Sequence, residues 1–340
     1  MKRLALAFLL ALAPALAGAQ EHNWTHSTDP VTHVVTYTDS VTGKTLKLGR
    51  REPTPGTVKP QSKAGGIFAP LLSGLPGPPP ATLDYTPAAI PFLYDPMDNL
   101  TLGDCVPAAI IHAGGTFIAN QSQPATGIPF DDGSALALYE KACGYVYGNP
   151  ATDTGCYPDV AIQYVVDHGL PTPRPYNNDP NAQLWTGAHK FVGYTSIDPT
   201  NQLEVETSVW LFENVFVGFD LPDAWMDPPP SGNGFVWDVA GLPDLLGHEV
   251  PILGYNSQGV IIDTWGYIGT ITWAALAYYG VPEPWVFDPQ FDTAPEVYTV
   301  YSPDVVSPTT GKAPNGFTAA QLKAYFAAFV AANAASVTKH

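Results

Sequence analysis

The sequence predicts an α+β protein in which helices come first and strands follow. In the first half, residues 104–119 and 158–169 carry apolar residues at helical spacing. In the second half, four apolar runs are typical of strands, at residues 209–221, 248–255, 259–266 and 296–302. Because the two kinds of element are segregated along the chain, we expect a helical N-terminal half packed against a C-terminal antiparallel β-sheet half.

The first helix places a cysteine at its start. Asp104 can cap the helix, and Pro107 falls in the first turn, where a missing N–H costs nothing. Cys105 therefore lies at a helix N-terminus, whose partial positive charge favours the thiolate over the thiol.

The second helix, residues 158–169, has Val160, Tyr164 and Val165 on one face and Gly169 as its stop signal. We expect this face to be the buried one.

A last helix begins with a capping box formed by Thr318 and Gln321. Its apolar residues at helical spacing are Leu322, Phe326, Phe329 and Val330. We expect this apolar face to pack on the body of the protein.

Residues 1–19 have the pattern of a cleavable signal peptide, with basic residues, an apolar run and small residues at the cleavage site. No later stretch is long and apolar enough to span a membrane. The sequence therefore predicts a secreted or periplasmic protein without membrane insertion.

Residues 20–77 form a separate N-terminal region. Residues 32–49 alternate apolar and polar residues around a turn at 40–43, which indicates a hairpin, and a stretch rich in proline and glycine follows. This region is a pro-region, an adaptor or an arm lying on the main domain. We assign residues 78–340 to the main domain.

The chain is acidic, with a formal charge of −17. This charge argues against nucleic acid or an anionic membrane as a partner. It would attract a cationic substrate, although acidic surfaces more often serve solubility.

Three cysteines in an exported chain leave one thiol without an intramolecular partner. Cys143 and Cys156 flank a loop of turn residues and look like a disulfide pair. That pairing leaves Cys105 free.

A nucleophilic cysteine needs a base. Of the eight histidines, His22, His26 and His33 lie in the N-terminal region, His340 is terminal, and His112 and His168 fall within helices where we expect packing roles. His189 and His248 remain. His248 opens a hairpin that returns at Asp263, so a carboxylate comes back towards the same end of the sheet, provided that a bulge or bend adjusts the register.

Four stretches in this order, "LGDC", "GC" followed by "AIQYVVDHGL", "GHEVPILGY" and "DTWG", resemble the landmarks of papain-like cysteine peptidases. His248 and Asp263 follow Cys105 by 143 and 158 positions, close to the spacing of that family. The resemblance covers about residues 78 to 290 and implies a papain-like fold.

The resemblance implies a catalytic triad of Cys105 as nucleophile, His248 as base and Asp263 as the group that orients the imidazole. Asn99 falls where the family has its oxyanion-hole glutamine, so its amide and the Cys105 backbone N–H would form the oxyanion hole. Trp265 would shield the histidine–aspartate hydrogen bond from water.

The sequence departs from the best-known family members at four places. Asn99 replaces glutamine, Asp263 replaces asparagine, Val106 replaces the tryptophan after the cysteine, and a single disulfide can form. A carboxylate can still accept the imidazole N–H. Asn99 is also part of an Asn-Leu-Thr sequon in a turn, so a turn role for it is an equal alternative.

The sequence contains no metal-ligand spacing, phosphate loop or Gly-x-Ser-x-Gly motif, and it implies no cofactor. The leading hypothesis is an exported cysteine hydrolase, a peptidase acting on peptide or protein substrates through a thioester acyl-enzyme. The alternatives are a catalytically degenerate papain-fold binding protein and a cell-wall amidase or acyltransferase that uses the same triad.

Overall fold

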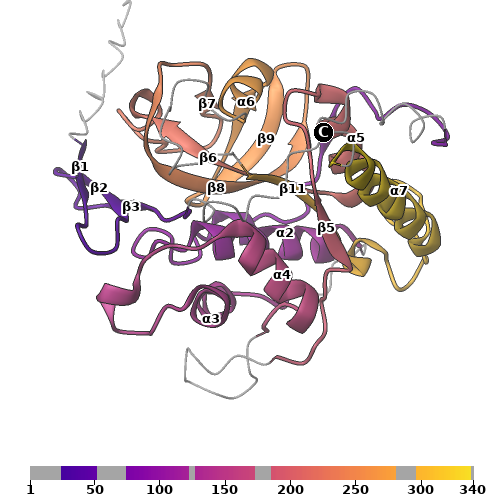
Figure 1. Cartoon of the computed structure of the whole chain (residues 1–340), viewed down its shortest axis with the longest axis horizontal. Helices are drawn as coiled ribbons and strands as arrows, with labels where there is room; N and C mark the ends of the chain where they lie inside the picture. The colour runs from indigo at the N-terminus through magenta and orange to yellow at the C-terminus, as the bar shows by residue number, and fades with distance from the viewer. Residues whose placement is uncertain (1–23, 52–73, 122–126, 173–184, 281–295, 338–340) are drawn as a thin grey trace, which may run out of the picture.

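The protein folds as a layer of helices beneath a twisted sheet, with a small N-terminal sheet at one end (Figure 1). The computed structural model describes residues 24–51, 74–121, 127–172, 185–280 and 296–337. The signal-peptide prediction and most of the Pro-rich stretch lie outside these ranges.

Three of the six described α-helices precede the main strands of the large sheet, as predicted, and the other three lie among or after those strands. The α-helices are α2 (Cys105–Gln121), α3 (Asp132–Cys143), α4 (Pro158–His168), α5 (Gln202–Phe212), α6 (Trp273–Tyr279) and α7 (Ala319–Val337). The strands are β1 (Trp24–Thr28), β2 (Val35–Asp39), β3 (Thr45–Leu48), β4 (Leu83–Asp84), β5 (Gly193–Ser196), β6 (Val215–Pro222), β7 (Val236–Trp237), β8 (Pro243–Tyr255), β9 (Gly259–Thr264), β10 (Tyr267–Thr272) and β11 (Glu296–Tyr301).

The large sheet has the strand order β5-β11-β6-β8-β9-β10-β7, and β4 pairs with β8. All of its pairings are antiparallel except that between β10 and β7. This arrangement confirms the predicted α+β class, in which the cysteine helix packs against an antiparallel sheet.

Helix α2 is the centre of the molecule. Its residues from Cys105 to Ala119 are all buried, so it is apolar on every side and is covered on every side. Helices α3 and α4 lie below α2, and β8 lies above it (Figure 1). Cys105 is therefore held at the junction of the two halves.

The predicted hairpin is confirmed. Strands β2 and β3 pair antiparallel with Val35 opposite Leu48, and β1 adds to β2 to make a three-stranded sheet. The side chains of Val35, Tyr37, Leu46 and Leu48 are buried. This N-terminal sheet, residues 24–48, is thus attached to the body by a hydrophobic contact as well as by the chain.

Two details of the predicted elements are wrong. Residues 209–212 end helix α5 instead of starting a strand, because α5 ends at Glu213 in the left-handed conformation without the glycine that would signal a stop. In α4 the buried side chains are Ala161, Ile162 and Val165, whereas Val160 is exposed.

Helix α7 packs on β5 and β11, as its apolar spacing predicts. Its capping box is present, since the Thr318 N–H donates to Gln321 Oε1 at 3.0 Å and the Gln321 N–H donates to Thr318 Oγ1 at 3.4 Å. Leu322 and Phe329 are buried, but Val330 lies on the exposed side.

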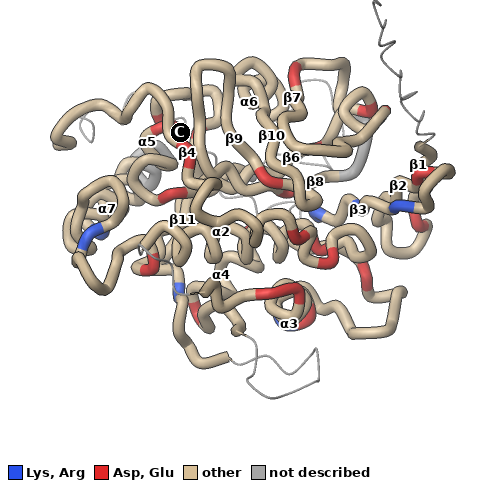
Figure 2. Tube along the Cα trace, turned by 180° about the vertical axis from the view of Figure 1, so that it is seen from behind, with Lys and Arg blue, Asp and Glu red and all other residues tan. Residues whose placement is uncertain are grey.

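Acidic residues are spread over the molecule and basic residues are few (Figure 2). None of the described helices is both long and apolar enough to cross a membrane.

We expect Leu322→Ala to lower the free energy of unfolding by about 3 kcal/mol, because it leaves a cavity between α7 and the sheet. Val330→Ala, eight residues further along the same helix, should change it by less than about 0.5 kcal/mol. Urea denaturation followed by circular dichroism measures both. Equal effects would show that α7 does not dock through its predicted face.

Candidate active site

Cys105 opens α2 with its side chain buried, and the structure leaves its thiol free. Burial raises the pKa of Cys105 to about 12, while backbone hydrogen bonds from Glu249 and Gly49 act in the opposite direction. The expectation that the helix N-terminus favours the thiolate is therefore not met in this arrangement. The sulfur is a neutral thiol between β8 and the N-terminal region.

The other two cysteines form the predicted disulfide. Cys143, at the end of α3, is bonded to Cys156, and their Cα atoms are 5.1 Å apart. This bond confirms that Cys105 is the cysteine left over.

His248 lies on β8, immediately before Glu249, whose backbone contacts the Cys105 thiol. Its Nε2 is hydrogen-bonded to Thr264 Oγ1 at 2.7 Å, and the Trp265 ring stacks on the imidazole with 4.4 Å between centroids. Burial, followed by the nearby Arg50 guanidinium, lowers the pKa of His248 to about 3. The imidazole is therefore neutral, and the Trp265 ring covers it. That Trp265 shields a histidine–aspartate hydrogen bond stays a prediction.

The free nitrogen of His248 is the one a base would use. If Nε2–H donates to Thr264, then Nδ1 carries the lone pair, and this buried atom has no hydrogen-bond partner among the described residues. The described residues contain no hydrogen bond between the Cys105 thiol and this ring. Cys105 lies on the α2 side of the sheet, whereas His248 on β8 shares the opposite face with Thr264 and the Trp265 ring, so the two groups are not engaged here.

Asp263 is bonded to a histidine other than the expected one. Its carboxylate is 2.6 Å from His112 Nδ1, on α2, while Thr264 takes the expected place beside His248. Strand alternation explains the difference. The β8–β9 register pairs Ile252 with Ile262, so His248 shares a face with Thr264, and Asp263 points to the opposite face.

A bulge does follow Ile252, as the predicted hairpin required. It shifts the pairing by one residue and leaves Asp263 on the α2 side of the sheet. The role of Asp263 as the orienting group stays a prediction, and the structure adds Thr264 as a candidate for that role.

The His112–Asp263 pair is buried, with side-chain exposures of 3% and 0%. Burial lowers the pKa of His112, but the adjacent Asp263 carboxylate outweighs it and gives a net rise. The second ring nitrogen faces the Asp95 carbonyl at 2.9 Å, so both nitrogens face acceptors, which favours the imidazolium. The sequence predicts a packing role for His112. Its position seven residues after Cys105, two helical turns along the same side of the helix, was the signal that could have suggested otherwise.

Asn99 sits in the turn before α2 and is buried. Its Nδ2 donates to the Leu102 carbonyl at 3.1 Å. Burial raises the pKa of the Asp104 carboxyl group well above its usual value, and the nearby Asn99 side chain acts in the opposite direction. The amide therefore holds the turn in this arrangement. Its part in an oxyanion hole stays a prediction.

The N-terminal region reaches the cysteine. The Arg50 N–H donates to the Gly247 carbonyl at 2.9 Å, on the residue before His248. On the other side, the Cys156 N–H donates to the Gly49 carbonyl at 2.8 Å and the Arg51 N–H donates to the Cys156 carbonyl at 2.7 Å. Residues 48–51, hereafter the crossing segment, are thus bound as an extended chain between the two halves.

Glycines make this crossing possible. A Cβ on Gly49 would collide with the backbone of Gly103, two residues before Cys105. A Cβ on Gly155 would collide with the Gly49 carbonyl. Gly49 therefore fits only because it, Gly103 and Gly155 all lack side chains at the contact.

A salt bridge also holds the N-terminal region in place. Lys47 Nζ forms a salt bridge of 2.7 Å with Asp153, whose other oxygen accepts from the Gly103 N–H at 2.8 Å.

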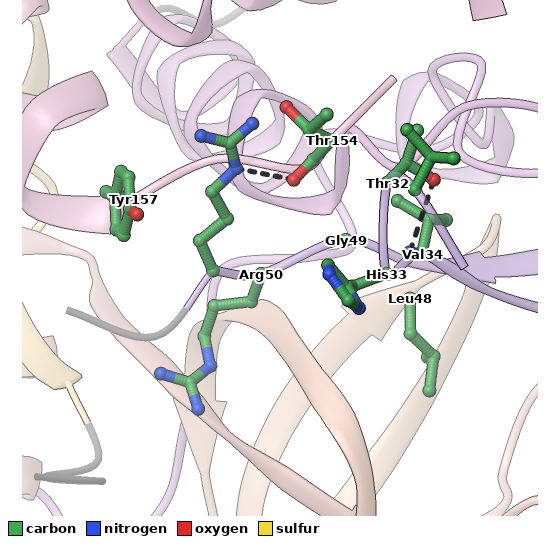
Figure 3. A pocket seen from close by; sticks show the side chains of 10 residues that line it. Thr32, His33, Val34, Leu48, Gly49, Arg50, Thr154 and Tyr157 are labelled. Carbon is green, nitrogen blue, oxygen red and sulfur yellow. Dashed lines mark hydrogen bonds between the residues drawn. The ribbon is translucent and has the colours of Figure 1, made fainter. Parts of the chain in front are cut away.

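A cavity of about 450 Å³ lies beside the crossing segment, lined by Gly49 and Arg50 together with Thr154 and Tyr157 (Figure 3). This cavity lies between the N-terminal region and the stretch from Thr154 to Tyr157.

Among the described residues, no cluster of three or more histidine, cysteine or acidic side chains is arranged to hold a metal ion.

No protein-family model matches the chain, and no curated protein matches its sequence. Among solved structures it is similar to xylellain, a cysteine protease from Xylella fastidiosa, with a TM-score of 0.47, 16% identity, and coverage of 75% of this chain and 95% of that one. A cysteine protease of Carica candamarcensis has a TM-score of 0.42 and 14% identity, with coverage of 66% of this chain and 98% of that one. Procathepsin L 3 of Tenebrio molitor has a TM-score of 0.44 and 16% identity, with coverage of 74% of this chain and 76% of that one. These structural neighbours are papain-like cysteine proteases at low identity.

We expect Gly49→Ala to increase the rate of Cys105 alkylation by iodoacetamide at least about tenfold at pH 7.5, because the added methyl group displaces the crossing segment and exposes the thiol. Gly77→Ala is the matched control, since a Cβ there meets nothing within 4 Å. Mass spectrometry of quenched samples gives the rates.

The wild-type alkylation rate should rise steadily from pH 6 to 9 without a plateau, because the pKa of Cys105 is about 12 with the segment in place. Equal rates in Gly49→Ala and Gly77→Ala would show that the crossing segment does not cover the thiol.

Proposed function

We propose that the protein is an exported cysteine hydrolase, a peptidase held closed by its own N-terminal region. The observation that supports it is the crossing segment, a peptide bound in extended form beside a free cysteine at a helix N-terminus. The groups that hold it are the backbone atoms of Gly247 and Cys156, which would bind any extended peptide in the same way.

In the proposed reaction, the crossing segment leaves and a substrate peptide takes its place. A rearrangement of β8 must also bring the His248 ring from the opposite face of the sheet to the side of Cys105. His248 Nδ1 then takes the Cys105 proton, and the thiolate attacks the carbonyl carbon of the substrate. The oxyanion accepts the Cys105 backbone N–H and the Asn99 amide once that amide turns from Leu102. The imidazolium protonates the leaving amine, and water then cleaves the thioester to release the acid and restore the thiol.

Departure of the segment would also change the two pKa values in the direction the reaction needs. Burial is the main cause of both shifts, and Arg50 is the second cause for His248. Solvent entry and loss of the guanidinium would lower the pKa of Cys105 and raise that of His248. The thiolate–imidazolium pair would then form at neutral pH.

The test uses Gly49→Ala in the full chain, incubated with a mixed peptide library and with an epoxide thiol inhibitor. We expect hydrolysis of library peptides and labelling of Cys105 alone, both abolished in Gly49→Ala combined with Cys105→Ser. His248→Gln in the same background should abolish hydrolysis. A folded Gly49→Ala protein that neither reacts with the inhibitor nor cleaves any peptide would overturn the proposal.

A catalytically degenerate binding protein is the second candidate, because Cys105 and His248 share no hydrogen bond and Asp263 is engaged with His112. It predicts that the opened protein binds peptides without cleaving them. Cell-wall fragments added to the library test the amidase alternative, since cleavage confined to them would favour it.

A separate experiment tests which residue orients the His248 imidazole. We expect Thr264→Val to lower kcat of the opened enzyme by about 10- to 100-fold with little change in KM, because the ring loses its only hydrogen bond among the described residues and drifts from its productive orientation. Thr264→Ser should retain most of the activity. If Asp263→Asn lowers kcat and Thr264→Val does not, then Asp263, and not Thr264, orients the His248 imidazole in the open state.

A further inference from the structure

Arg50 is buried in a way that arginines seldom are. Its side chain is 2% exposed, and Nη2 is 3.1 Å from Asp220 Oδ1. The Arg50 side chain extends from the crossing segment onto the large sheet, so the body of the protein contains a pocket that fits this side chain.

Two neighbouring strands build that pocket. The β6–β8 register sets Gly218 opposite Glu249 and Asp220 opposite Gly247. Residues paired across two antiparallel strands share a face of the sheet, and so do residues two apart along one strand. All four positions therefore lie on the same face. This face therefore carries two carboxylates and two positions without side chains.

The two glycines provide the space. A Cβ on Gly247 would collide with the Arg50 guanidinium, and a Cβ on Gly218 would collide with Arg50 Cδ and with Glu249 Oε2. The Glu249 carboxylate and the arginine side chain thus converge on the same point above Gly218. Any larger residue at either position would close the pocket.

The charges require a cation. Glu249 is buried, and Asp220 is partly exposed at the edge of the pocket. Without a cation between them, two carboxylates would face each other at low solvent exposure, which is costly. The planar guanidinium can bond two carboxylates at once, whereas an ammonium is a single point of charge.

The pocket adjoins the reactive groups. Gly247 and Glu249 flank His248, the Gly247 carbonyl binds the Arg50 N–H, and the Glu249 backbone bonds the Cys105 thiol. A side chain in this pocket therefore belongs to a residue whose backbone lies at the cysteine.

We propose that this pocket is a specificity site for an arginine side chain of the substrate, and that Arg50 occupies it in the closed protein as a stand-in. The inference rests on the proposed peptidase function and adds its substrate class, peptides with arginine beside the cleaved bond. The strong negative charge of the protein would draw such peptides in.

The first test measures specificity in the Gly49→Ala enzyme with peptides that differ only in one residue. We expect kcat/KM for arginine at one position to exceed that for leucine by about 10-fold or more. Glu249→Gln and Asp220→Asn should each reduce that ratio by about 10-fold, whereas Glu206→Gln, an acidic residue on α5 outside the pocket, should not change it. Hydrolysis with equal rates for arginine and leucine overturns the specificity site and leaves the peptidase function intact.

The second test does not depend on catalysis. Fluorescent peptides with the sequence of residues 45–51, TLKLGRR, and with leucine in place of Arg50 are bound to the Gly49→Ala, Cys105→Ser protein. We expect the arginine peptide to bind about 10-fold tighter, and Glu249→Gln to remove the difference. Equal affinities overturn the proposal.

A third measurement covers the case in which Gly49→Ala fails to fold. Arg50→Ala empties the pocket in an otherwise unchanged chain, and N-acetyl-arginine amide should raise its Tm more than N-acetyl-leucine amide does. The wild-type protein, with its pocket filled, should show no such difference. Identical shifts for the two amides in Arg50→Ala also overturn the proposal.

Discussion

The packing of α2 against β8 is the constraint on which the site depends. A helix that is buried on every side cannot slide or rotate without breaking contacts with the sheet above and the helices below. Its first residue is therefore fixed against the strand that carries His248 and Glu249. One half of the protein is mainly helical and the other is mainly β-sheet, and the candidate catalytic residues lie where the two halves pack together.

The arrangement of charge follows from the same contact. In the closed state, Cys105 and His248 are both neutral, because burial penalises the charged form of each. Positive charge nearby comes from the crossing segment and from Lys47 just before it, in the Arg50–Asp220 and Lys47–Asp153 pairs. The segment thus supplies positive charge to an acidic crevice, and it keeps the reactive pair out of water.

Much of the fold could be predicted from sequence, because it is encoded locally. The helix at Cys105, the hairpin within residues 32–49 and the capping box at Thr318 each depend on neighbouring residues. The Cys143–Cys156 bond could be predicted because its loop is short and rich in turn residues. The limits appear where a prediction depends on strand register, since a shift of one residue decides whether Asp263 or Thr264 faces His248. The path of residues 48–51 was not predictable either, because their partners lie about 100 and 200 residues away in the chain.

The disulfide has a consequence for how the crevice is made. Cys156 is covalently joined to the end of α3, and its backbone N–H and carbonyl are two of the groups that hold an extended peptide. Two kinds of bond anchor this segment to α3: the sulfur bridge, and the Tyr139 hydroxyl, which donates to Asp153 at 2.8 Å and accepts from the Gly155 N–H at 2.8 Å. Peptide recognition is thereby tied in part to oxidative maturation, because a chain that has not yet formed the disulfide holds this edge by the tyrosine alone.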